Sequence, residues 1–190
     1  MADLLNSNGL RVLAYFLAAA TCLIAWQRER AAANSSRPNL WPPFWLLSAA
    51  VLLAMGLARS TDLIAIATGL LRDEARATGW YNERRPLQAA VLAVVSVGWM
   101  LTVTIAIWRV PERRRRYLPY AILVFSLICY GAVRMVSYHY VDAVLYNHPV
   151  WGIRIGSIVE LAGTAFAITA ALIASRNLAL GLRMKGAPSH

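Results

Sequence analysis

Long runs of apolar residues alternate with short polar segments along nearly the whole chain. A helix needs roughly 20 mostly apolar residues to cross the hydrocarbon core of a bilayer. Runs that approach this length lie at about residues 10–26, 44–59, 87–108, 117–138 and 151–175. The pattern therefore predicts an all-α fold, a single integral membrane bundle of about five transmembrane helices.

The segment between the second and third spans is the least regular part of this pattern. Residues 63–71 are apolar and uncharged, so they predict either a continuation of the second span or a short re-entrant segment. Residues 72–79 carry Arg72, Asp73 and Arg76 at helical spacing and predict an interfacial helix on the outer leaflet, which Gly79 ends.

The composition agrees with a membrane protein and excludes two other classes. Of the 190 residues, 59% are hydrophobic and the mean hydropathy is +0.51, which is too apolar for a soluble domain. The net charge of +10 would suggest a nucleic-acid partner in a soluble protein. Here most of the excess lies at the ends of apolar runs, without an aromatic platform, so nucleic acid is not an expected partner.

The basic residues of the connecting segments predict the orientation, because Lys and Arg concentrate in cytoplasmic loops. With five spans, one side of the membrane receives Arg28, Arg30, Arg37, Arg109, Arg113, Arg114, Arg115, Arg116, Arg176, Arg183 and Lys185. We therefore expect a bacterial inner membrane protein with its N-terminus outside and its C-terminus in the cytoplasm. The basic run that ends at Arg116 is a stop-transfer signal in the simplest interpretation and an anionic-lipid site in the alternative one.

Charged residues lie inside the apolar runs, where an unpartnered charge costs at least about 2.5 kcal/mol. At 1.5 Å per residue, Arg59, Arg134 and Glu160 each lie about 24–27 Å from the cytoplasmic ends of their helices. They predict a polar layer about one turn below the outer surface, in which Arg134 pairs with Glu160 and Arg59 pairs with Asp62. The alternative interpretation is that these groups only fix helix packing.

Further polar residues extend this layer toward the outer surface. Tyr130 and Ser137 share a helix face with Arg134, and Arg154 lies at the top of the fifth span. An outer rim comprises Arg72, Arg76, Trp80, Tyr81, Arg84, Arg85 and Gln88, and in it Arg76, Arg84 and Arg85 could hold a phosphate or carboxylate. Ion pairing within the interfacial helix is the simpler explanation of these rim charges.

Two histidines near the outer surface suggest further chemistry. His139 and Asp142 are three residues apart, so in an enzyme they would be the general base and the residue that orients it. Together with His148 they are also weak candidates for metal ligands. Zinc requires three or four ligands in defined geometry, so the sequence predicts no metal site. The simplest interpretation is a hydrogen bond between His139 and Asp142 at the membrane boundary.

An ordered set of these residues carries a resemblance to a known group of proteins. The set is Asp62, Arg72, Gly79, Trp80, Tyr81, Arg84, Arg85, Gln88, Arg134, Ser137, His139, Asp142, Glu160 and Gly163. In this order the chain resembles an uncharacterised family of small multi-pass bacterial membrane proteins, over about residues 44–174. The resemblance supports the site residues and implies no reaction. The family pattern has a polar Asn-Lys-Gln type of stretch before the aspartate, where this chain has Ala58 to Thr61.

The sequence favours a non-enzymatic function for this polar layer. We expect it to open to the outer leaflet and to bind the headgroup of a membrane lipid or quinone, or else an envelope protein partner. One alternative is a membrane-embedded enzyme that acts on a lipid-linked substrate through His139 and Asp142. Another is a small transporter or proton-relay protein. No cofactor is assigned from the sequence, and a homo-oligomer is a further alternative.

Overall fold

The computed structural model describes residues 2–33, 41–79, 84–136 and 152–183 of the chain. Every regular element in these residues is a helix, which confirms the predicted all-α fold. The elements are α1 (Ala2–Asn6), α2 (Asn8–Ala33), α3 (Pro42–Ser60), α4 (Leu63–Ala77), α5 (Arg84–Arg109), the 3₁₀ helix η2 (Glu112–Tyr117), α6 (Leu118–Val136) and α8 (Ile155–Arg183). Within the described residues, five helices are long and apolar enough to cross a membrane: α2, α3, α5, α6 and α8.

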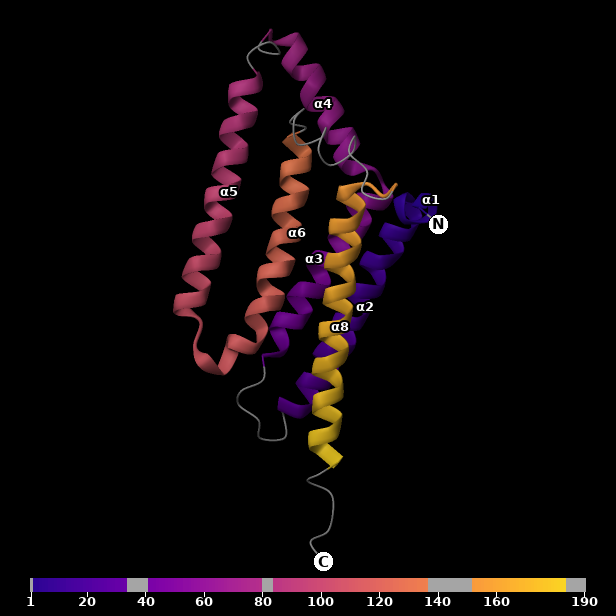
Figure 1. Cartoon of the computed structure of the whole chain (residues 1–190), viewed down its shortest axis with the longest axis vertical. Coiled ribbons are helices and arrows are strands. Elements are labelled where there is room, and N and C mark those ends of the chain that lie inside the picture. Colours follow the sequence, from indigo (N-terminus) through magenta and orange to yellow (C-terminus); the bar gives the residue numbers. More distant parts are fainter. Residues whose placement is uncertain (1, 34–40, 80–83, 137–151, 184–190) are drawn as a thin grey trace, which may run out of the picture.

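The helices form an elongated bundle around α2, which packs most extensively against α3 and α8. On the other side of the bundle α5 and α6 run antiparallel, joined at their lower ends by η2 (Figure 1). The helix α4 leaves the upper end of α3 and leads to the start of α5. The bundle thus has an N-terminal end, where α1 lies, and a basic end, defined by Arg28, Arg30, Arg109, Arg114, Arg115, Arg116 and Arg176.

Two helix starts have clear local causes. Ser7 precedes α2, and its Oγ accepts a hydrogen bond of 3.2 Å from the backbone N–H of Leu10, which satisfies a donor that the helix leaves free. At the start of α3, Pro42 and Pro43 occupy the first turn, where a missing N–H costs nothing and the fixed φ suits a helix. These signals set where two of the spans begin.

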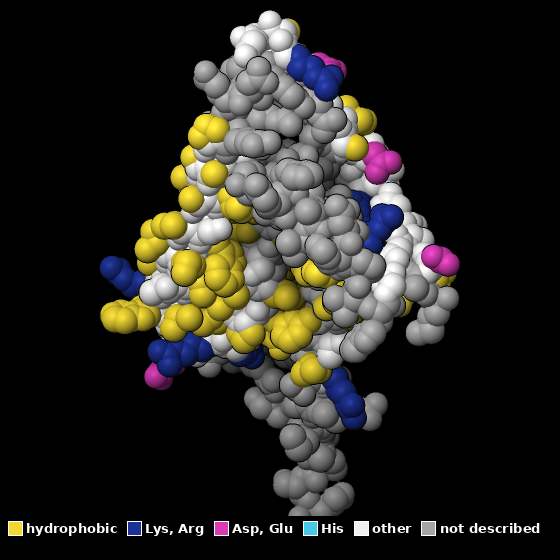
Figure 2. Space-filling model, turned by 45° about the horizontal axis from the view of Figure 1, so that its top comes forward, with side chains coloured by type: hydrophobic (Ala, Val, Ile, Leu, Met, Phe, Trp, Pro, Cys, Tyr) yellow, Lys and Arg dark blue, Asp and Glu magenta, His cyan; other side chains and the backbone are white. Residues whose placement is uncertain are grey.

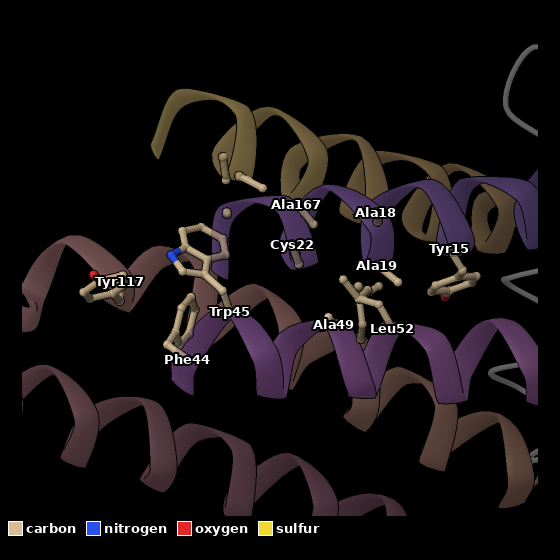
Figure 3. Close-up of a cluster of buried hydrophobic side chains, with 14 residues drawn as sticks. Tyr15, Ala18, Ala19, Cys22, Phe44, Trp45, Ala49, Leu52, Tyr117 and Ala167 are labelled. Atoms are coloured by element: carbon tan, nitrogen blue, oxygen red, sulfur yellow. The ribbon is translucent and has the colours of Figure 1, made fainter. Parts of the chain in front are cut away.

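The core of the bundle is built mainly from small residues on the three central helices. Alanines and Cys22 on α2 face Ala49 and Leu52 of α3, and alanines of α8 pack on the other side (Figure 3). Small side chains let helix backbones approach closely, which is how helices associate where lipid removes the hydrophobic driving force. At the basic end this alanine-rich core gives way to the larger rings of Phe44, Trp45 and Tyr117.

The second span does not continue through residues 63–71, which was one of the two predictions for that segment. Instead of continuing to residue 71, α3 stops at Ser60 and a turn at Thr61 and Asp62 precedes α4. Asp62 adopts a left-handed conformation with φ of 48°, which aspartate tolerates better than most residues and which a continuous helix does not permit. Residues 63–77 then form one helix, α4. The apolar segment 63–71 and most of the charged segment 72–79, which were predicted as separate elements, therefore belong to the same helix.

The surface of the bundle is strongly apolar around its middle (Figure 2). The window that makes α5 a candidate span, within Gln88–Arg109, has no buried residue, and this helix packs mainly on α6. Trp99 of α5 donates its indole hydrogen to Ser126 Oγ at 3.0 Å, which joins the two helices. An apolar helix with so little protein contact requires lipid around it.

Candidate functional site

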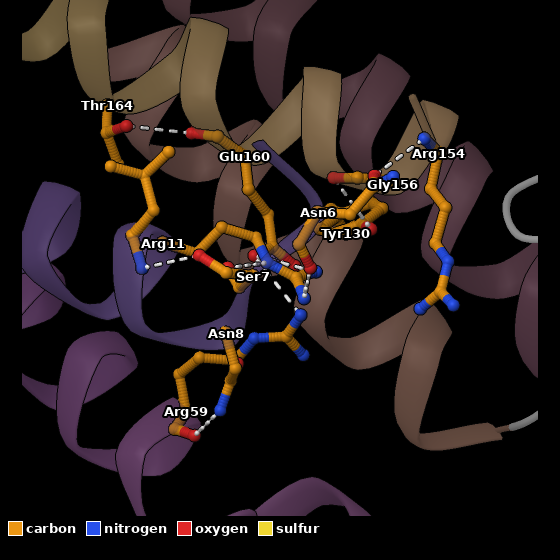
Figure 4. A network of polar contacts seen from close by, with 11 residues as sticks. Asn6, Ser7, Asn8, Arg11, Arg59, Tyr130, Arg154, Gly156, Glu160 and Thr164 are labelled. Atoms are coloured by element: carbon orange, nitrogen blue, oxygen red, sulfur yellow. Dashed lines mark hydrogen bonds and ion pairs between the residues drawn. The ribbon is translucent and has the colours of Figure 1, made fainter. Parts of the chain in front are cut away.

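Three charged side chains from three different helices meet inside the N-terminal half of the bundle. Glu160 of α8 faces Arg59 of α3, with 3.6 Å between Oε2 and Nη2, and Arg11 of α2, with 3.9 Å between Oε2 and Nη1. Their exposed fractions are 2% for Glu160, 9% for Arg59 and 5% for Arg11. We call these three residues the charge cluster (Figure 4).

Arg11 is held in the cluster by the first turn of its own helix. Its Nε donates to the carbonyl oxygen of Ser7 at 3.3 Å, and its Nη2 donates to the carbonyl oxygen of Asn6 at 3.1 Å. The guanidinium therefore satisfies carbonyl groups at the junction between α1 and α2 while its remaining nitrogen faces Glu160. A planar group with five donors suits such a position, where several acceptors surround one cation.

The junction between α1 and α2 connects the helices around the cluster. Asn8 Nδ2 donates to the carbonyl oxygen of Arg59 at 3.3 Å, at the end of α3. Asn6 donates through Nδ2 to the carbonyl oxygen of Gly152 at 2.9 Å and accepts through Oδ1 from the N–H of Arg154 at 2.9 Å. Asn8, the first residue of α2, thus contacts the end of α3, and Asn6, the last residue of α1, contacts the residues just before α8, directly beside the charged groups (Figure 4).

The contacts within the cluster are looser than direct salt bridges. Charge-assisted N–H···O bonds are typically about 2.7–2.9 Å long, whereas the nitrogen–oxygen distances here are 3.6 and 3.9 Å. Arg59 Nε and Ser157 Oγ are buried without a hydrogen-bond partner among the described residues, and Ser157 lies one turn before Glu160 on α8. A buried polar atom without a partner costs about 1–3 kcal/mol, so the site favours an additional acceptor beside Arg59 and Ser157.

A second buried carboxylate lies at the basic end of the bundle. Glu29 of α2 is 2% exposed and accepts a hydrogen bond from the hydroxyl of Tyr117. Arg116, whose side chain is 50% exposed, lies 3.7 Å from Oε1 of Glu29 and donates to the same hydroxyl. This carboxylate is therefore fully paired, unlike the arrangement around Arg59.

The two buried charged groups mark the two ends of one helix. Arg11 and Glu29 are 18 positions apart on α2, which corresponds to about 27 Å along a helix. The stretch between them carries no charge before Arg28. This spacing is close to the roughly 30 Å thickness of a bilayer core, so the two groups are far enough apart to lie at opposite boundaries of the hydrocarbon.

The structure brings together two of the residues that the sequence placed in one layer, and it changes one pairing. Arg59 and Glu160 are in contact, whereas Arg59 was expected to pair with Asp62. Asp62 is instead exposed in the turn between α3 and α4. In a continuous helix, Asp62 would lie about one turn beyond Arg59 and on the same face. Because the helix ends at Ser60, Asp62 does not lie on that face.

Other predicted residues take lesser positions. Tyr130 of α6 donates a long hydrogen bond of 3.4 Å to the carbonyl oxygen of Gly156 on α8. Arg154 is exposed, and its backbone N–H is the group that contacts Asn6. Of the rim, Arg76 is exposed and pairs with Asp73 at 3.9 Å, and Gln88 is half-buried on α5.

Several predicted residues lie outside what the structure describes. For Arg72, Arg84, Arg85 and Arg134 only the place on a helix is described, so the expected pair of Arg134 and Glu160 stays a prediction. The residues Trp80, Tyr81, Ser137, His139, Asp142 and His148 lie outside the described ranges. Within the described part of the chain, no group of three or more His, Cys, Asp or Glu residues could hold a metal ion.

Two charged residues of these sites were not predicted. Arg11 lies in the second position of the first predicted span and reads from the sequence as part of its boundary. Glu29 stands between Arg28 and Arg30 and reads as part of a solvated loop. The signal that identifies both is helical spacing: Arg11, Tyr15, Ala18, Cys22, Ala25 and Glu29 follow one face of α2, and all of them are buried.

The five apolar helices and their buried charges define the class of this chain, a multi-pass membrane protein. Comparison with known protein families, with curated proteins and with solved structures gives no match.

Proposed function

We propose that this protein resides in the bacterial inner membrane and binds the anionic headgroup of a lipid at the charge cluster. One observation carries the proposal: two guanidinium groups share a single buried carboxylate, at distances too long for direct hydrogen bonds. The three residues together hold two positive charges and one negative charge. Arg59 Nε is a charged donor that is buried without a hydrogen-bond partner among the described residues, so a phosphate or carboxylate beside it is favoured.

The chemistry of the cluster fits a headgroup better than it fits packing alone. A tight ion pair that only fixes two helices would be expected to form direct hydrogen bonds. Arg59 Nε, on the neighbouring helix α3, and Ser157 Oγ, on the same helix as Glu160, are instead buried without a hydrogen-bond partner among the described residues. Both are hydrogen-bond donors, so an oxygen-rich anion would satisfy them.

The position of the cluster fits a lipid ligand. Arg59 is 17 positions after Pro42, or about 25 Å along α3 from the basic end. If the basic end faces the cytoplasm, as the excess of arginine there favours, the cluster lies near the outer boundary of the hydrocarbon. A headgroup from the outer leaflet would reach it without crossing the membrane.

Native mass spectrometry of the detergent-purified protein tests the proposal. The protein is incubated with equal amounts of phosphatidylglycerol and phosphatidylethanolamine, and the bound lipid is counted. We expect the wild type to retain phosphatidylglycerol in preference to phosphatidylethanolamine, and Arg59→Gln to retain one phosphatidylglycerol fewer than the wild type. Arg176→Gln is the matched control, because it removes one exposed arginine from α8 at the other end and should keep the bound lipid.

A second variant distinguishes binding from a purely structural role. Glu160→Gln removes the one carboxylate of the cluster, so phosphatidylglycerol should bind more tightly and should raise the thermal stability of this variant more than that of the wild type. A structural ion pair predicts no such gain from lipid. Equal retention of both lipids by the wild type, a neutral quinone retained regardless of Arg59, or a protein subunit in place of lipid would each overturn the proposal.

A further inference from the structure

Arginine side chains at the basic end stack on aromatic rings. The guanidinium carbon of Arg30 lies 5.5 Å from the ring centroid of Trp26. The corresponding distances are 4.8 Å from Arg114 to Trp41 and 4.6 Å from Arg116 to Tyr117. We call these three pairs the collar. They come from α2, from η2 and from the residue that precedes α3, so the fold assembles them from three segments.

The rings of the collar are fixed by the core of the bundle. Tyr117 is 3% exposed and packs against Phe44 and Trp45, with centroid distances of 5.1 and 6.2 Å. Trp41 stacks on Phe44 at 5.8 Å and donates its backbone N–H to the hydroxyl of Tyr117 at 3.0 Å. Arginines that lie on such rings are held in place before any ligand arrives, which lowers the entropy cost of binding.

The basic end carries far more positive than negative charge. Its described and exposed arginines are Arg28, Arg30, Arg109, Arg114, Arg115, Arg116 and Arg176. The described carboxylates near them are Glu112, which is exposed, and Glu29, which is buried and occupied by Tyr117 and Arg116. In Figure 2 dark blue side chains follow the lower edge of the yellow surface. Such a surface attracts anions.

Apolar side chains border the collar and select the kind of anion. Leu23 and Ile24, one turn before Trp26 and Arg28 on α2, are 40% and 44% exposed. A ligand that covers these apolar side chains with one part and contacts the arginines with another part is an amphiphile. Free phosphate would contact the arginines and leave the apolar side chains exposed.

We propose that the collar is a binding surface for anionic phospholipids in the leaflet at the basic end, with Arg30, Arg114 and Arg116 on the lipid phosphates. The exposed apolar side chains Leu23 and Ile24 of α2 take the acyl chains, and Trp26 and Trp41 lie at the level of the glycerol backbone. This surface is separate from the charge cluster, about 27 Å away along α2, and shares no residue with it.

A lipid titration followed by native mass spectrometry tests the collar, with phosphatidylglycerol as the probe and phosphatidylcholine as the neutral comparison. The variant Arg30→Gln/Arg114→Gln should weaken the binding of phosphatidylglycerol by up to about 25-fold, since each of the two arginines contributes about fivefold near an anionic surface. The matched control is Arg109→Gln/Arg176→Gln. It removes the same charge from the same end, at arginines that stack on no aromatic ring among the described residues, and should lose clearly less.

Several results would overturn the inference. One is equal weakening in both double variants, which would mean that charge alone matters. Another is competition by millimolar inorganic phosphate, which would assign the surface to a soluble anion. A third is the same affinity for phosphatidylcholine as for phosphatidylglycerol. The Arg59→Gln variant should keep the collar lipids, so failure of either proposal is visible without the other.

Discussion

Tyr117 donates its hydroxyl hydrogen to the buried carboxylate of Glu29, with oxygen–oxygen distances of 2.9 Å to Oε1 and 2.8 Å to Oε2. A phenol has one hydrogen, so the two carboxylate oxygens share it. The same hydroxyl oxygen accepts from the N–H of Trp41 and from Arg116. One hydroxyl thereby uses its whole hydrogen-bonding capacity to join α2, η2 and the start of α3.

The first prediction concerns this hydroxyl. Tyr117→Phe leaves the ring in place and removes the donor to Glu29 together with the acceptor for Trp41. The free energy of unfolding should fall by about 1–3 kcal/mol, because buried polar groups lose their partner. Thermal unfolding in detergent, followed by circular dichroism, measures the change.

The control for this prediction is Tyr120→Phe. Tyr120 packs on Trp45 and Phe166, with centroid distances of 5.8 Å to each ring, and its hydroxyl forms no hydrogen bond among the described residues. Its substitution should leave the melting temperature close to that of the wild type. An equal loss in the two variants would contradict the role assigned to the hydroxyl of Tyr117.

The second prediction ranks substitutions in the charge cluster. Glu160→Leu leaves the guanidinium groups of Arg11 and Arg59 without the carboxylate that they share, and should cost about 3–5 kcal/mol of stability. Arg59→Leu leaves Glu160 facing Arg11 at 3.9 Å, a balanced pair, and should cost less. Thermal unfolding of the two variants in the same detergent, without added lipid, decides the order. The reverse order would mean that Arg11 alone does not balance Glu160.

The third prediction concerns the close approach of α6 and α8. A Cβ atom added at Gly163 would lie 2.8 Å from Cδ2 and 3.3 Å from Cδ1 of Leu127, which is 2% exposed. Gly163→Ala should therefore destabilise the bundle by about 1–3 kcal/mol through overpacking. The double variant Gly163→Ala/Leu127→Ala should lose less than the sum of the two single variants, because the smaller side chain leaves room.

Gly98 on α5 provides the matched control for Gly163. A Cβ atom added there would meet nothing within 4 Å. Gly98→Ala should be neutral or should stabilise the helix by up to about 1 kcal/mol, which is the difference in helix propensity between the two residues. Additive losses in the Gly163 and Leu127 double variant would show that the two helices do not meet at this point.

The fourth prediction concerns orientation. The two cysteines, Cys22 and Cys129, are unpaired and are first replaced by serine. A single cysteine is then introduced at Asp3 or at Arg176, both exposed, at opposite ends of the bundle. In intact spheroplasts a membrane-impermeant maleimide should label Asp3→Cys at once, and Arg176→Cys only after permeabilisation. Labelling in the reverse order would place the basic end outside and the charge cluster near the cytoplasm.

Counting positions along apolar runs placed Arg59 and Glu160 at one depth, and the structure brings them into contact. That success rests on geometry, because a helix rises 1.5 Å per residue whatever surrounds it. The partner of Arg59 was wrong for a local reason. From the sequence, Asp62 was expected about one helical turn beyond Arg59. The helix ends at Ser60 and Asp62 has a left-handed backbone conformation, so the two residues do not belong to one continuous helix.

The same counting missed Arg11 and Glu29, which lie near the two ends of α2. A charge at the end of an apolar run is the usual mark of a membrane boundary, where water solvates it. Whether such a residue faces water or the bundle depends on which neighbouring helix covers that face. Here α3, α8 and η2 cover it, and no property of α2 alone specifies those neighbours.

The sequence by itself determined the helical class, the number of apolar helices and the axial level of the charges, since hydrophobic length and helical rise are properties of single segments. Only the tertiary structure decided that Glu160 meets Arg11 and Arg59, and that Glu29 meets Tyr117. These contacts join residues more than 80 positions apart in the sequence, such as Glu29 and Tyr117, which are 88 apart. Their partners are fixed by which helix faces pack together, and the small residues that permit this packing are compatible with many arrangements.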